Sequence, residues 1–404
     1  MLKKNFNFDV IIVGSSYCGM SCALALAKIS SQLKIAIIEK EDVFANTKSV
    51  DGRAYAISSR SLNFFKKIGI FDQIQSYSGQ IKDIKITDNK SPFILDFLSE
   101  EIDESVLQNN QQFGQIVENH YIFEALKSQL KQQNNITIFC PNYYQEINFT
   151  EDSHSKVKVT LNDQNIITAK LLLACDGRFS KIRELFAIKT RIKDYHQSAI
   201  VFKIEHLLDH KNIAYEKFYP GGPLAILPLQ NPKQSSIVWI VKNEMEKILL
   251  SLDQQNFIQQ LNKKIGSCLG ESQIISERFS YQLNLVEAEK FFYQQCLLIG
   301  DAGCAIHPIA GQGFNLAIST IELLTDLIAK NILCGLEISS VNFIESFNKN
   351  NKINTKKMII ATDLLNSIFE TKNQPITIFR ELGLEIINSS KYLKKFFIKN
   401  AGGF

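Results

Sequence analysis

The sequence predicts an α/β protein in which a β-sheet domain is inserted into a parallel-sheet domain, with helices at the C-terminal side. Short, almost wholly apolar segments at 9–13, 34–40 and 169–177 are typical of strands buried inside a parallel sheet. The first of them runs into a glycine-containing turn and a helical pattern, which together form a strand–turn–helix unit. Residues 195–285 instead alternate as half-buried strands do, and helices are expected from residue 312 onward.

The bulk composition is that of an ordinary globular protein in a reducing compartment. At 404 residues, 45% of them hydrophobic and 21% charged, the chain is long enough for two joined domains. A net charge of +4 gives no support for a nucleic-acid partner. Eight scattered cysteines form no C-x-x-C pair, so neither a metal site nor a disulfide framework is predicted. No run of about 20 apolar residues exists, and the sequence therefore predicts a cytoplasmic protein.

The turn after the first strand carries small residues at fixed spacing. In "VIIVGSSYCGMSCALA" the spacing is Gly14-x-Ser16-x-x-Gly19, between a strand and a helix. Gly14 permits the sharp turn, Gly19 lets the helix pack closely on the strand, and free amides at the helix N-terminus attract a pyrophosphate. Glu39, followed by Lys40, ends the next strand, where a carboxylate accepts hydrogen bonds from an adenosine ribose. The pattern favours a dinucleotide site over an ordinary strand–helix turn.

Two later segments place an aspartate at the end of an apolar strand. "LLLACDGRFSKIRELF" stops at Asp176-Gly177, and "CLLIGDAGCAIHPIAGQGFN" places Asp301 at the same point of its strand. Asp301 can accept hydrogen bonds from the ribityl hydroxyls of a flavin. The amides after Gly311-Gln312-Gly313, at a helix N-terminus, can face the electron-rich end of a reduced flavin. Taken alone, each segment is explained equally well as an ordinary turn.

Taken together, the motifs resemble one family. The GxSxxG turn with its glutamate, the Asp-Gly turn and the late GDA…HPxAGQGxN segment are similar to the FAD-dependent aromatic hydroxylases of the p-hydroxybenzoate hydroxylase type. Within that type, the resemblance is closest to the ubiquinone-biosynthesis branch, the 2-polyprenylphenol hydroxylases. Further matching stretches are "DGRAYAISSRS", "FGQIVENHYIFEAL", "DYHQSAIV" and "AYEKFYPGGPLAILPL", so the resemblance spans about residues 8–370.

The resemblance implies a division into domains. We expect a Rossmann-like FAD-binding domain that is discontinuous, an inserted β-rich substrate domain and a C-terminal helical region. The expected boundaries are 1–79, 110–185 and 286–340 for the FAD-binding domain, 80–109 and 186–285 for the substrate domain, and 341–404 for the helical region.

The resemblance also implies roles for single residues. The first motif is expected at the FAD pyrophosphate, with its glutamate at the ribose. Arg53 matches an arginine expected near the pyrophosphate, and Asp176-Gly177 matches a motif that serves both FAD and a transiently bound NAD(P)H. The remaining expected flavin contacts are Gln115, Asp301 at the ribityl chain, and Pro308, Gly311, Gln312, Gly313 and Asn315 along the isoalloxazine.

Three departures from the family pattern surround the expected cofactor. Ser16 replaces the usual middle glycine, Gly303-Cys304 stand where the family favours Ala-His, and Ala317 and Thr320 stand where it favours an acid. No catalytic residue is predicted. His307 is better explained as the residue that fixes the following turn than as a general acid or base.

The activity implied by the resemblance is that of an FAD-dependent monooxygenase. NAD(P)H would supply electrons, and one atom of O₂ would be transferred to the ring of a polyprenylated phenol while the inserted sheet excludes water. Alternatives are a hydroxylase of a soluble aromatic compound and a non-catalytic flavin-binding scaffold subunit of a biosynthetic complex. Candidate liners of the flavin's reactive face are Leu224, Ile226, Leu227 and Trp239, although core packing is expected for any one of them.

The C-terminal stretch is basic. Residues 348–404 hold ten Lys/Arg against four Asp/Glu, and "SSKYLKKFFIKNAGGF" interleaves lysines with apolar side chains. Such a segment suits an anionic membrane surface, where a polyprenyl substrate resides. The more ordinary interpretation is a terminal helix packed on the body. Peripheral contact with the inner membrane, and with a ubiquinone-biosynthesis complex, is therefore a hypothesis.

Overall fold

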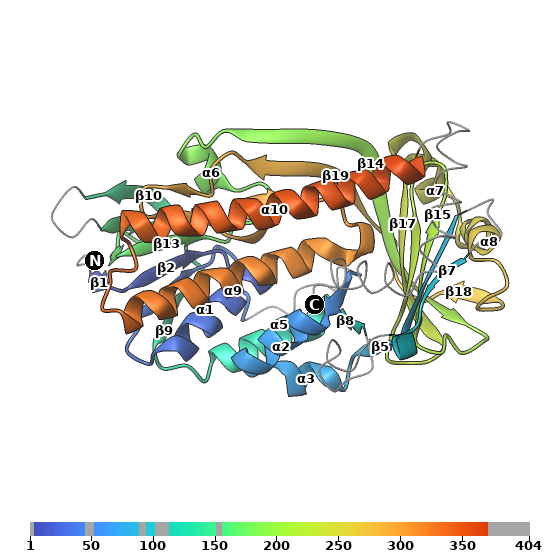
Figure 1. Ribbon diagram of the computed structural model, residues 1–404, viewed down its shortest axis with the longest axis horizontal. Helices are drawn as coiled ribbons and strands as arrows, with labels where there is room; N and C mark the ends of the chain where they lie inside the picture. Colours follow the sequence, from blue (N-terminus) through green and yellow to red (C-terminus); the bar gives the residue numbers. More distant parts are fainter. Residues whose placement is uncertain (1–3, 45–51, 89–93, 102–112, 151–155, 371–404) are drawn as a thin grey trace.

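The computed structural model describes residues 4–44, 52–88, 94–101, 113–150 and 156–370. Figure 1 shows an elongated molecule with a parallel sheet at one end and a large antiparallel sheet at the other. Two long helices, α9 (Gln312–Leu333) and α10 (Val341–Glu370), run side by side along the molecule. The predicted fold class is confirmed.

The parallel sheet has six strands, and its short apolar strands are its centre. Neighbours from β21 to β9 are all parallel, and an antiparallel β20 closes one edge. All residues of β2, β3 and β13 are buried, which explains why these strands are continuous apolar runs. In spatial order the strands are β20 (Phe292–Tyr293), β21 (Cys296–Leu298), β13 (Leu171–Ala174), β2 (Val10–Val13), β3 (Ile35–Ile38) and β9 (Ile136–Phe139).

Helices cover one face of this sheet, and a small sheet covers the other. Val10 and Ile12 point into the helical core, while Ile11 and Val13 point to the small sheet, as the period of two requires. The helical layer contains α1 (Tyr17–Ile29), α2 (Ser59–Ile68), α3 (Phe71–Gln75), α5 (Asn119–Leu130) and α9. The small sheet has the order β1 (Asn5–Asn7), β12 (Ile166–Ala169), β11 (Val157–Leu161) and β10 (Tyr144–Phe149).

The antiparallel sheet has nine strands and carries helices on its outer face. There Phe257 of α8 packs edge-on against Phe202 and Trp239. Its path is β22 (Cys304–Ala305), β19 (Phe279–Ala288), β14 (Thr190–His206), β17 (Gln234–Lys242), β16 (Leu224–Pro228), β15 (Ile213–Phe218), β6 (Asp83–Asp88) and β7 (Ile94–Phe97), with β18 (Ser272–Ile274) beside β14. The helices here are α7 (Asn243–Ser251) and α8 (Gln254–Ile265).

Three of the four candidate liners of the flavin's reactive face belong to the outer-face core, in agreement with the favoured role of core packing. Leu224, Ile226 and Trp239 are buried in the cluster that contains Phe257, because they point toward α8. Leu227 has the opposite parity and points away from α8, into a second cluster. The alternation of β16 had indicated two faces, but not which of them meets the rest of the molecule.

A three-stranded sheet lies between the two larger sheets. It has the order β4 (Ala54–Ser58), β8 (Gly114–Glu118) and β5 (Gly79–Ile81). Tyr55 and Ile57 join the helical core, whereas Ala54, Ala56 and Ile116 pack toward the nine-stranded sheet. The short elements η1 (Ser99–Glu101), α6 (Lys181–Leu185), η2 (Gly300–Ala302) and η3 (Ile309–Gly311) complete the described chain.

Helix α10 joins both ends of the molecule. In its first half, Asn351 Oδ1 accepts a hydrogen bond from Thr320 Oγ1 of α9 at 3.0 Å. Farther along, Asp363 pairs with Lys193 Nζ at 3.0 Å and accepts a hydrogen bond from the Tyr195 hydroxyl. Thr320, a departure from the family pattern, thus holds α10. The predicted domain boundaries stay a prediction, and the basic segment at 389–404 lies outside the described residues.

Candidate functional site

The predicted cofactor residues follow neighbouring parallel strands at one edge of the six-stranded sheet. Ala174, Val13 and Ile38 lie in register, so the chain beyond each of them leaves the sheet at the same level. Leu298 of β21 is in register with Ala174 as well. Three inter-strand spacings separate β3 from β21, which places the chain ends before Glu39 and Asp301 roughly 14 Å apart. The carboxyl edge of a parallel sheet is where nucleotides bind in such folds.

The Gly14–Gly19 turn brings α1 against the neighbouring strand end. A Cβ on Gly19 would lie 1.9 Å from the Gly14 carbonyl oxygen, and one on Gly14 would lie 2.5 Å from the Cys175 oxygen. Gly14 has φ +98°, which side chains rarely adopt. Ser16 begins the helix with φ −70°, an ordinary value, so its side chain fits without strain. The departure at Ser16 therefore leaves the turn intact.

Glu39 closes the other side of this turn. Its Oε2 accepts hydrogen bonds from the Ser15 amide (2.7 Å) and the Ser15 hydroxyl (2.8 Å). Its Oε1 accepts one from the Glu41 amide at 3.1 Å. A carboxylate has about four acceptor positions, so Glu39 is fixed in place and can still accept a bond from a ligand. Lys40 beside it is exposed.

Asp176 and Arg183 connect the second and third segments. Asp176 Oδ2 accepts from the Ile182 amide at 3.1 Å, whereas its Oδ1 is buried without a partner. Gly177 follows with φ +81°. The buried Arg183 guanidinium donates to the carbonyls of Ala302 (2.6 Å) and Arg178 (2.9 Å). Removal from water lowers the pKa of Arg183. The hydrogen bond from Arg183 to Ala302 thus joins the second segment to the third next to the sheet edge.

Asp301 lies in a partly buried position near two arginines. Burial raises the pKa of the Asp301 carboxyl, and the positive charges of Arg178 and Arg53 act in the opposite direction. Burial and the charge of Asp301 raise the pKa of the Tyr17 phenol. Arg53, which is exposed, therefore reaches the same region as Asp301, although it comes from the segment before β4.

An aromatic cluster lies beside Asp301. The ring of Phe314 stacks on Tyr55 with centroids 4.5 Å apart and contacts Tyr17 at 4.6 Å. Tyr17 comes from the glycine-rich turn, Tyr55 from β4 and Phe314 from α9. The cluster is therefore a second contact between the first and third segments, besides the close approach of Gly300 to Cys18.

The 308–315 segment is held against β4 and α2. Gly311 has φ +64°, and a Cβ there would lie 2.9 Å from that of Ala56. The Asn315 amide donates to the Ala56 and Gly311 carbonyls and accepts from Ser58 N (3.0 Å) and Ser61 Oγ (2.8 Å). Asn315 thus fixes the loop. Pro308 is partly buried, and Gln312 and Gly313 form the N-terminus of the 22-residue helix α9.

Gln115 is 2% exposed, and its Oε1 has no hydrogen-bond partner. It lies on β8, paired with Ile57 of β4 and Gln80 of β5. A buried amide oxygen without a partner is unusual in a stable fold. Together with Asp176 Oδ1, it is an acceptor that a bound flavin nucleotide could satisfy, so the residues present fit the group.

His307 has a structural role. Its Nε2 lies 3.1 Å from Gln197 Oε1, and its Nδ1 accepts from the Ile309 amide. Burial lowers the pKa of His307 to about 4, so the ring is neutral at pH 7. A neutral ring that bonds through both nitrogens fixes the turn and ties it to β14, as the interpretation from sequence favoured.

Sequence reasoning gave Arg178, Arg183 and Tyr17 no role at the site. Arg178 directly follows the Asp-Gly turn, and this position after a strand end was the available signal. Arg183 had been placed on a helix start, but its reach to Ala302 is a contact across 119 residues that spacing cannot show.

These features define a flavoprotein with a dinucleotide-binding fold. They are the parallel sheet, the glycine-rich turn, the carboxylates beyond three strand ends and the buried oxygens of Gln115 and Asp176 that have no partner. Comparison with known proteins agrees. The family described as FAD binding domain matches residues 7–333. The chain belongs to this family and, within it, to the FAD-dependent monooxygenases that include the ubiquinone hydroxylases.

Two relatives illustrate the match. Ubiquinone hydroxylase UbiL of Rhodospirillum rubrum is 30% identical over 396 residues, which cover 98% of this chain and 89% of that protein. The human mitochondrial ubiquinone biosynthesis monooxygenase COQ6 is 26% identical over 437 residues, covering 96% of this chain and 91% of that protein. The predicted resemblance to the ubiquinone-biosynthesis branch is confirmed.

A solved structure shares the fold. The crystal structure of p-nitrophenol 4-monooxygenase PnpA from Pseudomonas putida matches with a TM-score of 0.77, covering 99% of both chains at 14% identity. At this identity the likeness establishes the fold alone. Within the part of the chain that the structure describes, no helix is long and apolar enough to cross a membrane.

Proposed function

We propose that this FAD-dependent monooxygenase uses NAD(P)H and O₂ to hydroxylate the aromatic ring of a polyprenylated phenol in ubiquinone biosynthesis. The observation that carries the proposal is the convergence of Glu39, Asp176 and Asp301 beyond the ends of neighbouring parallel strands. The names of the relatives supply the pathway, and 98% of this chain is covered by the match to UbiL.

The residues of this chain would bind FAD in an extended form along the sheet edge. The α1 N-terminus between Gly14 and Gly19 would receive the pyrophosphate, because free amides and the helix dipole favour anions there. Glu39 would accept from the adenosine ribose and Asp301 from the ribityl chain. Bound FAD supplies the redox chemistry with O₂, while the protein positions the ring and excludes water.

The remaining predicted contacts are part of the same proposal. Arg53, whose charge reaches Asp301, would neutralise pyrophosphate oxygens. Gln115 and Asp176 would use their buried, unpartnered oxygens toward the cofactor. The full set of proposed FAD-site residues is Gly14, Ser16, Gly19, Glu39, Lys40, Arg53, Gln115, Asp176, Gly177, Asp301, Pro308, Gly311, Gln312, Gly313 and Asn315.

The test is turnover by the reconstituted protein. The chain is loaded with FAD, supplied with NADH or NADPH in air, and given 2-geranylphenol or, in parallel, 4-hydroxybenzoate. We expect a product of the prenylated probe that is one oxygen atom heavier, and no product from the soluble acid. Hydroxylation of 4-hydroxybenzoate alone would contradict the proposal and favour a soluble substrate. A protein that binds no FAD would favour the scaffold alternative.

We also propose peripheral contact with an anionic membrane through the basic C-terminal stretch. The support is its composition, since lysines alternate there with aromatic side chains at 391–399. Deletion of residues 389–404 is expected to reduce co-sedimentation with vesicles containing phosphatidylglycerol, with little effect on vesicles of phosphatidylcholine. Equal sedimentation of the full and shortened chains would contradict this proposal.

A further inference from the structure

Glu216 is an acidic side chain in an apolar part of the nine-stranded sheet. It lies on β15 between Ile86 of β6 and Ala225 of β16, which are its partners in register. No hydrogen bond or ion pair joins Glu216 to another described residue. Burial alone raises its pKa to about 7. A carboxyl group in such surroundings lowers the stability of the fold. Its presence therefore indicates a function rather than a contribution to stability.

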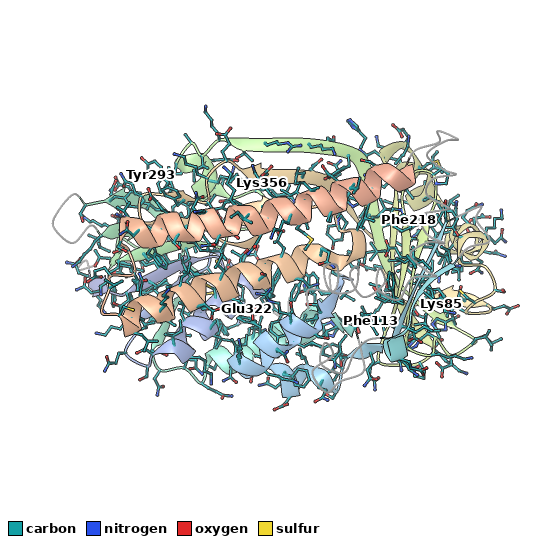
Figure 2. All side chains as sticks on the ribbon, viewed as in Figure 1. Lys85, Phe113, Phe218, Tyr293, Glu322 and Lys356 are labelled. Carbon is teal, nitrogen blue, oxygen red and sulfur yellow. The ribbon has the colours of Figure 1, made fainter. Side chains whose placement is uncertain are left out.

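The side chain of Glu216 points toward the flavin-binding half of the molecule. Ala214 and Leu227, on the same face, pack in one cluster with Ala54 and Ala56 of β4. Ala56 in turn touches the Gly311 turn. In Figure 2, Phe113, a member of that cluster, lies on the side of the nine-stranded sheet that faces the parallel-sheet end.

Other contacts fix the same face against the proposed FAD site. The Arg53 guanidinium carbon lies 5.5 Å from the ring centre of Tyr281 on β19. Lys203 of β14 forms an ion pair with Glu118 at the end of β8, at 2.8 Å. Glu216 therefore belongs to the surface that meets the cofactor-binding half, not to the surface under α8.

Apolar side chains of β16 on this face are partly accessible to solvent, whereas those of β16 under α8 are fully buried. Ala225 and Leu227 of β16 are partly exposed although they point inward between two sheets. Their neighbours Leu224 and Ile226, under α8, are 0% and 1% exposed. Ile86 beside Glu216 and Ala54 across the interface are partly exposed too. Small, accessible apolar side chains around one carboxylate suit an apolar molecule with a single hydroxyl.

We infer that the Glu216 carboxylate accepts the proton of the phenolic hydroxyl of the substrate and so activates the ring for hydroxylation. The inference rests on the proposed function. The phenol O–H bond breaks, its proton passes to a carboxylate oxygen, and the electron pair stays on the phenol oxygen and spreads to the ring. The ring gains one atom of O₂ as a hydroxyl group, and the other atom leaves as water. NAD(P)H supplies a hydride, that is, two electrons and one proton, and solvent supplies the two further protons that the hydroxyl group and the water need. The displaced ring proton passes to solvent, and Glu216 returns its proton to the phenolate.

A base whose pKa lies near the working pH is the most effective proton acceptor, and the surroundings of Glu216 meet this condition. Replacing an unpaired, half-buried carboxyl by an apolar side chain should not harm the fold. Glu216→Leu is therefore expected to unfold at the same temperature as the wild type or higher, while losing recognition of the hydroxyl. A merely structural glutamate would give the opposite result on stability.

The experiment compares 2-geranylphenol with its O-methyl ether, which has no proton to give. Dissociation constants for the FAD-loaded protein are measured by calorimetry. We expect the wild type to bind the phenol at least about tenfold more tightly, as a hydrogen bond to a charged group provides. Glu216→Leu should bind both probes equally. Glu216→Gln should hydroxylate the phenol at least about 100-fold more slowly. Glu271→Gln, an exposed glutamate before β18, is the matched control.

Three results would overturn the inference: a wild type without preference for the phenol, a Glu216→Leu variant that keeps the preference, or a Glu216→Gln variant with normal turnover. A wild type that prefers the phenol through Glu216 but forms no hydroxylated product would support this assignment and contradict the proposed function. The two are therefore separable.

Discussion

Gly19→Ala is expected to destabilise the protein by roughly 3 kcal/mol or more and to abolish FAD binding. The added methyl group would lie 1.9 Å from the Gly14 carbonyl oxygen, so α1 has to move away from the strand end. The same shift displaces the helix N-terminus at which the pyrophosphate is proposed to bind. Thermal unfolding of the FAD-free protein and fluorescence titration with FAD measure the two effects separately.

Ser21→Ala is the matched control on the same helix. Ser21 Oγ is buried without a partner, so its removal should leave stability unchanged or slightly higher. A Gly19→Ala protein that keeps both its unfolding temperature and its affinity for FAD would contradict the close packing of α1 on which the site is built.

Asp301→Ala is expected to weaken FAD binding at least about 100-fold, because hydrogen bonds to a charged acceptor are among the stronger ones. The FAD-free protein should respond differently. Burial raises the pKa of Asp301, so the folded protein binds a proton there more tightly than the unfolded chain does. The protonated carboxyl therefore adds to the free energy of unfolding at acid pH, and this contribution is lost as the pH rises above the ordinary carboxyl range. The variant should thus equal or exceed the wild type in unfolding temperature at neutral pH, and the difference should shrink toward acid pH.

The exposed Asp326 of α9 provides a control for charge alone. Asp326→Asn should leave FAD affinity unchanged. An Asp301→Ala protein with normal FAD affinity would remove Asp301 from the proposed site, whatever its stability.

The sheet edge could be predicted from sequence because parallel strands buried on both faces are continuous apolar runs. The end of each run marks the edge, and Glu39, Asp176 and Asp301 stand directly beyond it. Right-handed crossover connections between parallel strands then bring the carboxyl ends of these strands to the same edge. Burial of the strands on both faces determines both the local sequence pattern and the position of the strand ends, so this part of the site could be predicted.

Contacts across long sequence separations could not be predicted in this way. The hydrogen bonds of Asn315 to β4 are one example, because its place after the AGQG turn does not show these partners. The alternation of β16 and β17 shows that each strand has two faces. It does not show that Leu224 and Trp239 lie on the face that packs against α8. Glu216 stood in a matching stretch without a role, since nothing local shows that a charge on a strand points inward.

The double attachment of α10 has a consequence for protein engineering. One helix is tied to α9 through Asn351 and to β14 through Asp363, so the nine-stranded sheet is not a freely exchangeable module. A chimera that imports this sheet from a homologue should retain substrate selectivity and solubility only when the matching 341–370 segment is transplanted with it.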